Sequence, residues 1–86
     1  MEHEEHTDHE ERSPVELVTF LVTSLVDNPD EIVVEAEEGP DGMLVRVNAH
    51  PDDVGKIIGR GGRTIKSIRT LVRAVAGRSY HVSVEG

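Results

Sequence analysis

The residues best suited to chemistry form one short run of glycines and bases in this 86-residue chain. The glycines are Gly59, Gly61 and Gly62, and the bases around them are Lys56, Arg60 and Arg63. Glycine permits positive φ and lets a second backbone approach closely, while guanidinium and ammonium groups attract phosphate. A helix that begins after Gly62 would add free N–H groups and the positive end of its dipole near Gly62 and Arg63. The run therefore predicts a site for a sugar–phosphate backbone.

Enzymatic phosphate motifs do not fit this spacing. A Walker P-loop needs Lys-Ser or Lys-Thr directly after its last glycine and a strand before it, whereas Arg63-Thr64 follows a predicted helix. The dinucleotide motif needs glycine at position 64 and a larger βαβ unit. The acid pair Asp52-Asp53 lacks a nucleophile beside it and is explained by stabilisation of a helix N-terminus. We therefore expect no enzyme, no cofactor and no metal site.

Two predicted helices must position the glycine loop. The first spans residues 52–58, and the second spans residues 63–76, with Gly77 as its C-cap signal. The second helix separates an apolar stripe from a basic side. The stripe contains Ile65, Ile68, Leu71, Val72 and Val75, and the basic side contains Lys66, Arg69 and Arg73. The loop is thus expected between two helices that bury their apolar sides.

The flanking segments complete an α+β pattern. Ser13 and Pro14 fit the N-cap and first position of a helix over residues 14–26. Alternating apolar and polar residues predict strands at 31–38, 43–49 and 79–84, the first two joined by a glycine-rich turn. The predicted order is helix, strand, strand, helix, helix, strand.

Charge is divided unevenly along the chain. Lys and Arg total 9 against 17 Asp and Glu, which gives a net charge of −8. Residues 1–42 hold fourteen of the acids and one base, whereas residues 43–86 hold three acids and eight bases. No acid occurs between residues 54 and 84. A solvated helix face usually mixes signs, so the basic segment indicates a polyanionic partner for one face.

Composition excludes several other classes. The chain has no cysteine, which removes disulfide scaffolds and thiolate zinc sites. It has one Phe and one Tyr, too few for the stacking platforms of RRM or cold-shock domains. No apolar run approaches the ~18 residues of a membrane span, and the acidic N-terminus is unlike a secretory signal. One small, cytoplasmic domain with a modest core is expected.

The glycine loop resembles a known nucleic-acid clamp. Residues 58–65, Ile-Gly-Arg-Gly-Gly-Arg-Thr-Ile, resemble the Ile-Gly-x-x-Gly core of K-homology (KH) domains. In that family the loop holds about four nucleotides of a single strand. The resemblance implies a type II (prokaryotic) KH domain over residues 13–86. Its order is α-β-β-α-α-β, with helices packed on one face of a three-stranded sheet.

The stretches 53–59 and 65–72 are most similar to KhpA, a family of small bacterial single-KH proteins. The resemblance implies a cytoplasmic RNA chaperone that pairs with itself or with a KhpB/Jag-like RNA-binding protein. It also implies a link to cell elongation, cell shape and peptidoglycan homeostasis. The implied RNA-binding residues are Lys56, Ile57, Ile58, Gly59, Arg60, Gly61, Gly62, Arg63, Ile65 and Lys66. Gly59 and Gly62 should shape the clamp, and Arg60 should meet phosphate.

Some of these assignments have a competing interpretation. The three isoleucines are more typical of core than of a base-holding groove. Arg46 and His81 are further candidates for the groove edge. The alternative function is a protein-interaction module whose RNA binding depends on a partner. Solvent exposure of Val18, Val22 or Val75 would favour that alternative.

The first twelve residues form an acidic segment with six acids and one base. Because they offer almost nothing apolar to bury, we expect a disordered tail. Its three histidines, at positions 3, 6 and 9, alternate with carboxylates and could hold a divalent metal, but a solvated tail is favoured. The tail is also a candidate competitor with RNA for the basic face.

Overall fold

A computed structural model of the chain describes residues 13–86. The predicted disordered tail and its histidines lie outside the described residues, so their assignment stays a prediction.

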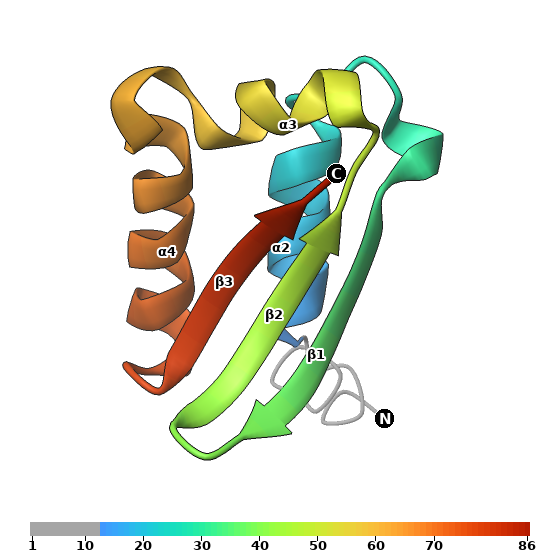
Figure 1. Cartoon of the computed structure of the whole chain (residues 1–86). Helices are drawn as coiled ribbons and strands as arrows, with labels where there is room; N and C mark the ends of the chain where they lie inside the picture. The colour runs from blue at the N-terminus through green and yellow to red at the C-terminus, as the bar shows by residue number, and fades with distance from the viewer. Residues whose placement is uncertain (1–12) are drawn as a thin grey trace, which may run out of the picture.

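The order of elements confirms the α-β-β-α-α-β prediction (Figure 1). The helices are α2 (Pro14–Thr23), α3 (Pro51–Ile58) and α4 (Arg63–Ala76), with 3₁₀ turns η1 (Pro29–Glu31) and η2 (Arg60–Gly62). The strands are β1 (Val33–Gly39), β2 (Gly42–Asn48) and β3 (Tyr80–Glu85). They form one sheet in the order β1-β2-β3, with β1 antiparallel and β3 parallel to β2.

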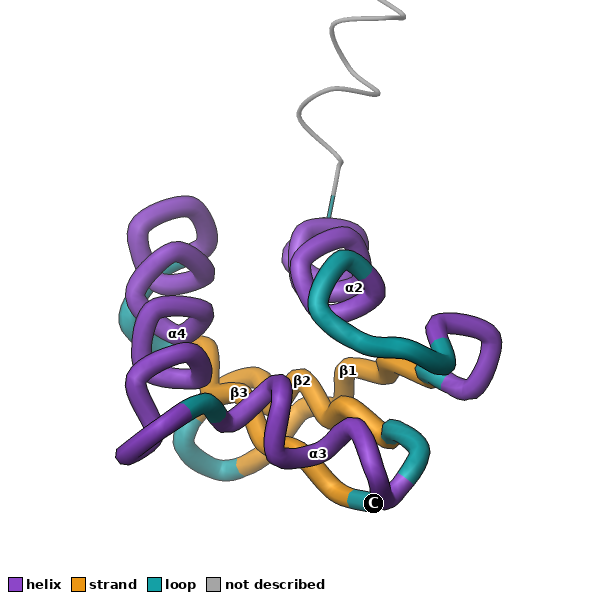
Figure 2. Tube along the Cα trace, turned by 90° about the horizontal axis from the view of Figure 1, so that it is seen from above, coloured by secondary structure: helices purple, strands orange, loops and turns teal. Residues whose placement is uncertain are grey.

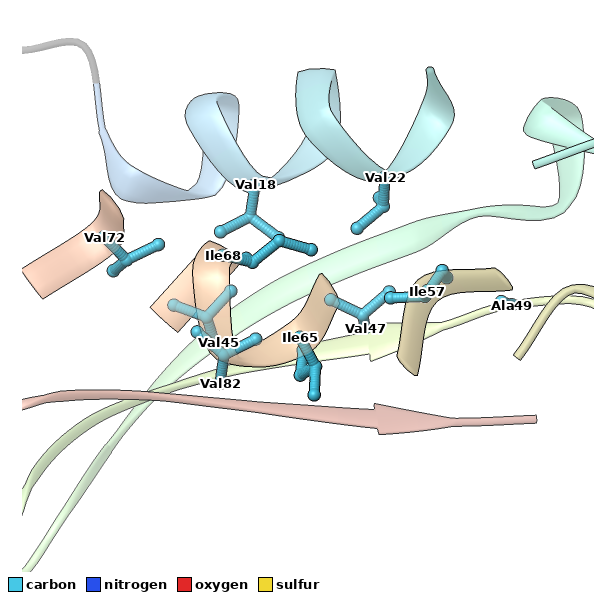
Figure 3. Close-up of a cluster of buried hydrophobic side chains, with 10 residues drawn as sticks. All are labelled: Val18, Val22, Val45, Val47, Ala49, Ile57, Ile65, Ile68, Val72 and Val82. Atoms are coloured by element: carbon cyan, nitrogen blue, oxygen red, sulfur yellow. The ribbon is translucent and has the colours of Figure 1, made fainter. Parts of the chain in front are cut away.

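The helices cover one face of the sheet, as predicted. Figure 2 shows α2 and α4 on the same side of the strands, while α3 crosses the end where β2 and β3 finish. Alternation along β2 points Val45 and Val47 into this helical layer, where both are fully buried. They meet Val18 and Val22 of α2 and a valine–isoleucine row of α4 (Figure 3). The core thus fastens both helices to the central strand.

The apolar stripe of α4 is narrower than predicted. Ile65, Ile68 and Val72 are buried, but Leu71 and Val75 are 47% and 70% exposed. The sheet therefore covers only part of the predicted stripe. Around the helix, Val75 lies about 20° and Leu71 about 60° beyond Ile68 on the side away from Val72, so both fall at the uncovered edge of the stripe.

Two predicted boundaries also shift. The first helix ends at Thr23 instead of residue 26, and the hydroxyls of Thr19, Thr23 and Ser24 bond to carbonyls one turn earlier. The first strand begins at Val33 because the preceding residues, which start with Pro29, form the 3₁₀ turn η1. Neither shift changes the position of the glycine loop.

Candidate nucleic-acid interface

The glycine loop is the 3₁₀ turn η2 between α3 and α4. Gly59, Gly61 and Gly62 have φ of 80°, 63° and 77°, in the region that favours glycine. A Cβ on Gly59 would overlap the Thr64 side chain, whereas one on Gly61 or Gly62 would meet nothing within 4 Å. Gly59 is therefore required by packing within the loop. The other two leave an unobstructed surface for a ligand backbone.

Backbone amides of the loop are already engaged. The N–H of Gly62 donates to the Gly59 carbonyl at 3.1 Å, and the N–H of Arg63 donates to the Arg60 carbonyl. The turn η2 therefore uses two of the N–H groups that were expected to be free at the start of the helix. Anion binding at this junction therefore rests mainly on side chains and on the dipole of the fourteen-residue helix α4.

Three basic side chains beside the loop are available for phosphate. Arg60, Arg63 and Lys66 are exposed, and none has an ion-pair partner among residues 13–86. Lys56 differs, since its ammonium group lies 3.3 Å from Asp27 and 3.8 Å from Asp53. Its charge is largely engaged within the fold. Of these four bases, Lys56 is thus paired within the fold, whereas the other three have no ion-pair partner among residues 13–86.

The three isoleucines assigned to the groove occupy different environments. Ile57 and Ile65 are buried in the core (Figure 3), whereas Ile58 is half-buried. Ile57 precedes the loop on α3 and Ile65 follows it on α4, so they anchor both helices that hold it. Only Ile58 retains surface that a base can contact. The core interpretation therefore describes Ile57 and Ile65 in this structure.

A groove of about 400 Å³ lies between α4 and β3. It is lined by Lys66, Arg69, Thr70, Arg73, His81 and Val82. Arg69 donates from Nε and Nη2 to the Val82 carbonyl at 3.2 and 3.1 Å. Arg73 donates from Nε to the Tyr80 carbonyl at 3.2 Å. The two arginines therefore cross the groove and hold its walls together.

Sequence analysis missed this role for Arg69 and Arg73, which it placed only on a basic helix side. Their spacing of four residues on one helix face was the available signal, but nothing local showed that a strand edge lies beside it. His81 lines the groove, as considered. Arg46 does not, because its guanidinium pairs with Glu37 at 2.9 Å and Glu85 at 3.3 Å on the uncovered face of the sheet.

No role was predicted from the sequence for Gly55 either. It lies inside α3, is exposed, and has no positive φ. A Cβ there would meet nothing within 4 Å, so nothing in the described fold requires glycine. Glycine inside a helix costs about 1 kcal/mol relative to alanine. The packing of the described fold therefore does not explain glycine at this position.

Asp53 positions α3 from below the surface. Its fully buried carboxylate accepts hydrogen bonds from the backbone N–H groups of Asp27 and Asn28 and from Asn28 Nδ2 at 3.0–3.3 Å. Burial raises its pKa, but the bonds from Asn28 and Asp27 and the nearby Lys56 charge outweigh it, so the pKa lies below its ordinary value of 3.8. Asp53 therefore ties α3 to the segment after α2, a stronger role than the predicted dipole effect.

The described residues show neither a membrane-crossing helix nor a metal cluster. No helix over residues 13–86 combines the length and apolar character that a membrane span requires. Within the same range, no three His, Asp or Glu side chains gather closely enough to hold a metal ion.

Comparison with known proteins gives consistent matches. The family model for the KhpA/KhpB KH domain matches residues 15–85. The RNA-binding protein KhpA of Mycobacterium tuberculosis is 49% identical over 70 residues, covering 81% of this chain and 88% of that protein. The proteins of the same name from Streptomyces coelicolor and Oceanobacillus iheyensis are 44% and 48% identical over 69 and 58 residues, covering 80% and 67% of this chain and 87% and 77% of their own. No solved structure matches the chain significantly.

Proposed function

The chain belongs to the KhpA/KhpB family of KH domains, and from that premise we propose that it binds single-stranded RNA across the loop between α3 and α4. The observation that carries this proposal is the loop itself. Gly61 and Gly62 leave the backbone open to a ligand, and Arg60 and Arg63 beside them have no ion-pair partner in the described chain. The relatives' description as RNA-binding proteins supports the same ligand.

The proposed path has a phosphate side and a base side. Arg60, Arg63 and Lys66 take the phosphates, while bases contact the exposed part of Ile58 or enter the groove between α4 and β3 that His81 lines. A KH clamp holds about four nucleotides, so a single copy binds weakly and with little sequence preference. Because phosphate contacts dominate, affinity falls steeply as salt rises.

A matched pair of variants at Gly62 tests this path. Asp and Asn both tolerate the left-handed conformation and differ mainly in charge, so Gly62→Asp and Gly62→Asn impose a similar backbone strain. Titrations with a fluorescent single-stranded RNA pool across a salt series should show at least tenfold weaker binding for Gly62→Asp than for Gly62→Asn. Circular dichroism checks that both fold. Equal affinities of the two variants would place RNA elsewhere.

A second part of the proposal is pairing with another copy or with a KhpB/Jag-like protein. Val75, Phe20 and Leu71 are 70%, 69% and 47% exposed, which favours a partner surface. Val18 and Val22 are fully buried and do not contribute to such a surface. By family resemblance, the paired protein would act as a cytoplasmic RNA chaperone in cell elongation and peptidoglycan homeostasis.

Sedimentation velocity tests the pairing surface. Val75→Asp should shift the protein toward the monomer, because it places a carboxylate on the exposed apolar side of α4. Ala74→Asp is the control, because Ala74 is an exposed neighbour and the substitution introduces the same charge. An unchanged self-association in Val75→Asp would remove α4 from the interface between copies.

A further inference from the structure

The strand β1 lies at the edge of the sheet remote from α4. The strand order is β1-β2-β3, and α4 packs beside β3. None of the described helices or strands lies along the outer side of β1 (Figure 1). Along its seven residues every position except Val34 is exposed. The strand therefore presents a backbone edge to solvent.

The register identifies the backbone groups on that edge. The pair Gly39↔Gly42 closes the hairpin around a two-residue turn, and an antiparallel ladder then alternates bonded and non-bonded pairs. Residues 33, 35, 37 and 39 therefore direct their N–H and C=O groups toward β2. Val34, Ala36 and Glu38 direct theirs outward, and no described backbone group outside the ladder bonds to them.

The side chains beside this edge are acidic. Glu35, Glu37 and Glu38 lie on β1, which contains no base. Arg46, on the neighbouring strand, is held by Glu37 and Glu85, so Glu35 and Glu38 keep no ion-pair partner among residues 13–86. Charged side chains on an edge deter pairing between neutral strands. Because the charged side chains on β1 are all acidic, they do not deter a strand that carries positive charge.

Charge also excludes the other occupants. Two copies paired edge to edge through β1 would bring like charges opposite each other, which destabilises a strand pair. A phosphate backbone would meet the same repulsion. The remaining occupant is an extended segment rich in Lys or Arg.

We propose that the outer edge of β1 accepts a basic extended segment of another protein as a fourth strand. Outward groups of Val34, Ala36 and Glu38 supply the backbone hydrogen bonds, as in other strand additions. Alternate Lys or Arg side chains lie beside Glu35 and Glu37 on the uncovered face of the sheet. The residues between them are small and apolar, and they lie beside Val34 and Ala36 on the helical face. The site leaves the glycine loop accessible, so RNA and the basic segment bind together.

A seven-residue peptide of alternating Lys and Val is the probe. In wild-type protein it should slow amide hydrogen exchange at Val34, Ala36 and Glu38. Ala36→Pro removes one outward N–H at an edge position that tolerates proline, and should weaken peptide binding at least tenfold. Ala36→Ser keeps that N–H and should bind like wild type. Equal binding by the Pro and Ser variants would overturn the proposal.

A charge variant keeps the test valid if Ala36→Pro does not fold. Glu35→Lys with Glu38→Lys reverses the two glutamates of β1 that have no ion-pair partner among residues 13–86 and should abolish peptide binding, whereas Asp52→Lys, on α3, should leave most of it. The RNA affinity of the double variant should not fall, which separates this site from the RNA proposal. Peptide binding that persists in the double variant, or that protects β3 instead of β1, would overturn the proposal.

Discussion

The helix junction and the β1 edge are two exposed regions of the same small domain with opposite charge. At the junction, the N–H groups of Gly62 and Arg63 are hydrogen-bonded within η2, so basic side chains supply the main attraction for the ligand. At β1, the outward backbone groups have no partner among residues 13–86, and side chains select what can pair with them. The net charge of −8 therefore describes neither surface.

Charged side chains near each region are compensated within the fold. Arg46, next to β1 on the uncovered face of the sheet, is paired with glutamates from both neighbouring strands. On the junction side, the buried Asp53 carboxylate is compensated by hydrogen bonds and by Lys56. Neither region therefore cancels the field of the other.

The largest expected effect comes from reversing charge on each region in turn. Arg60→Glu with Arg63→Glu should weaken binding of single-stranded RNA by about a hundredfold at low salt, because two phosphate contacts become repulsive. Glu35→Lys with Glu38→Lys changes the charge by the same amount in the opposite sense and should not weaken it. Fluorescence anisotropy on both variants measures the contrast. Comparable losses in the two variants would show that the regions are not distinct.

Local patterns were sufficient to predict the elements and the loop. The alternation around Val45 and Val47 predicted the central strand, and the glycines at 59–62 predicted the loop. Hydrogen bonds between distant segments were not predictable. Arg69 reaches a carbonyl thirteen residues away, and Asp53 accepts bonds from a segment twenty-five residues earlier. Such contacts depend on how the helices dock, which periodicity does not encode.

The exposed and buried isoleucines and valines illustrate the same limit. The stripe on α4 was predicted from spacing alone, but how much of it the sheet covers depends on the docking angle of the helix. Val75 therefore lies outside the core while Val72, one turn back, is fully buried. The motif at residues 58–65 similarly predicted the position of the loop, and residue type favoured the core for its isoleucines, but neither singled out Ile58 as the one that keeps exposed surface.

The junction's buried acid gives the second prediction. Asp53→Asn loses charged acceptors for the Asp27 and Asn28 amides, so the melting temperature at pH 7 should fall by about 5–10 °C. Because folding lowers the pKa of Asp53, its stabilising effect is complete above its ordinary pKa and is lost as pH falls through that range. Urea unfolding should show the wild-type advantage shrinking below about pH 4. An advantage that is constant from pH 6 to pH 2.5 would contradict this account.

Gly55 offers a way to separate ligand contact from stability at the junction. Gly55→Ala should raise the free energy of unfolding by about 0.5–1 kcal/mol, because alanine is the better helix former and its Cβ meets open space. The same methyl group should weaken RNA binding by about fivefold if a ligand backbone approaches there. Asp52→Ala, on the same helix, serves as the control. A variant that is more stable and binds RNA as well as wild type would remove Gly55 from the interface.

The smallest effect is expected from the acidic segment at the start of the chain. Deleting residues 1–12 removes six acids and one base and changes the net charge from −8 to −3. If these acids compete with RNA for the basic junction, truncation should tighten RNA binding about two- to threefold at low salt and have no effect near 0.5 M salt, where the Debye length is only a few ångströms. Binding of a basic peptide at β1 should not tighten on the same deletion, because the deletion removes acids. Equal RNA affinity of the full and truncated chains at low salt would show that residues 1–12 do not compete with RNA for the junction.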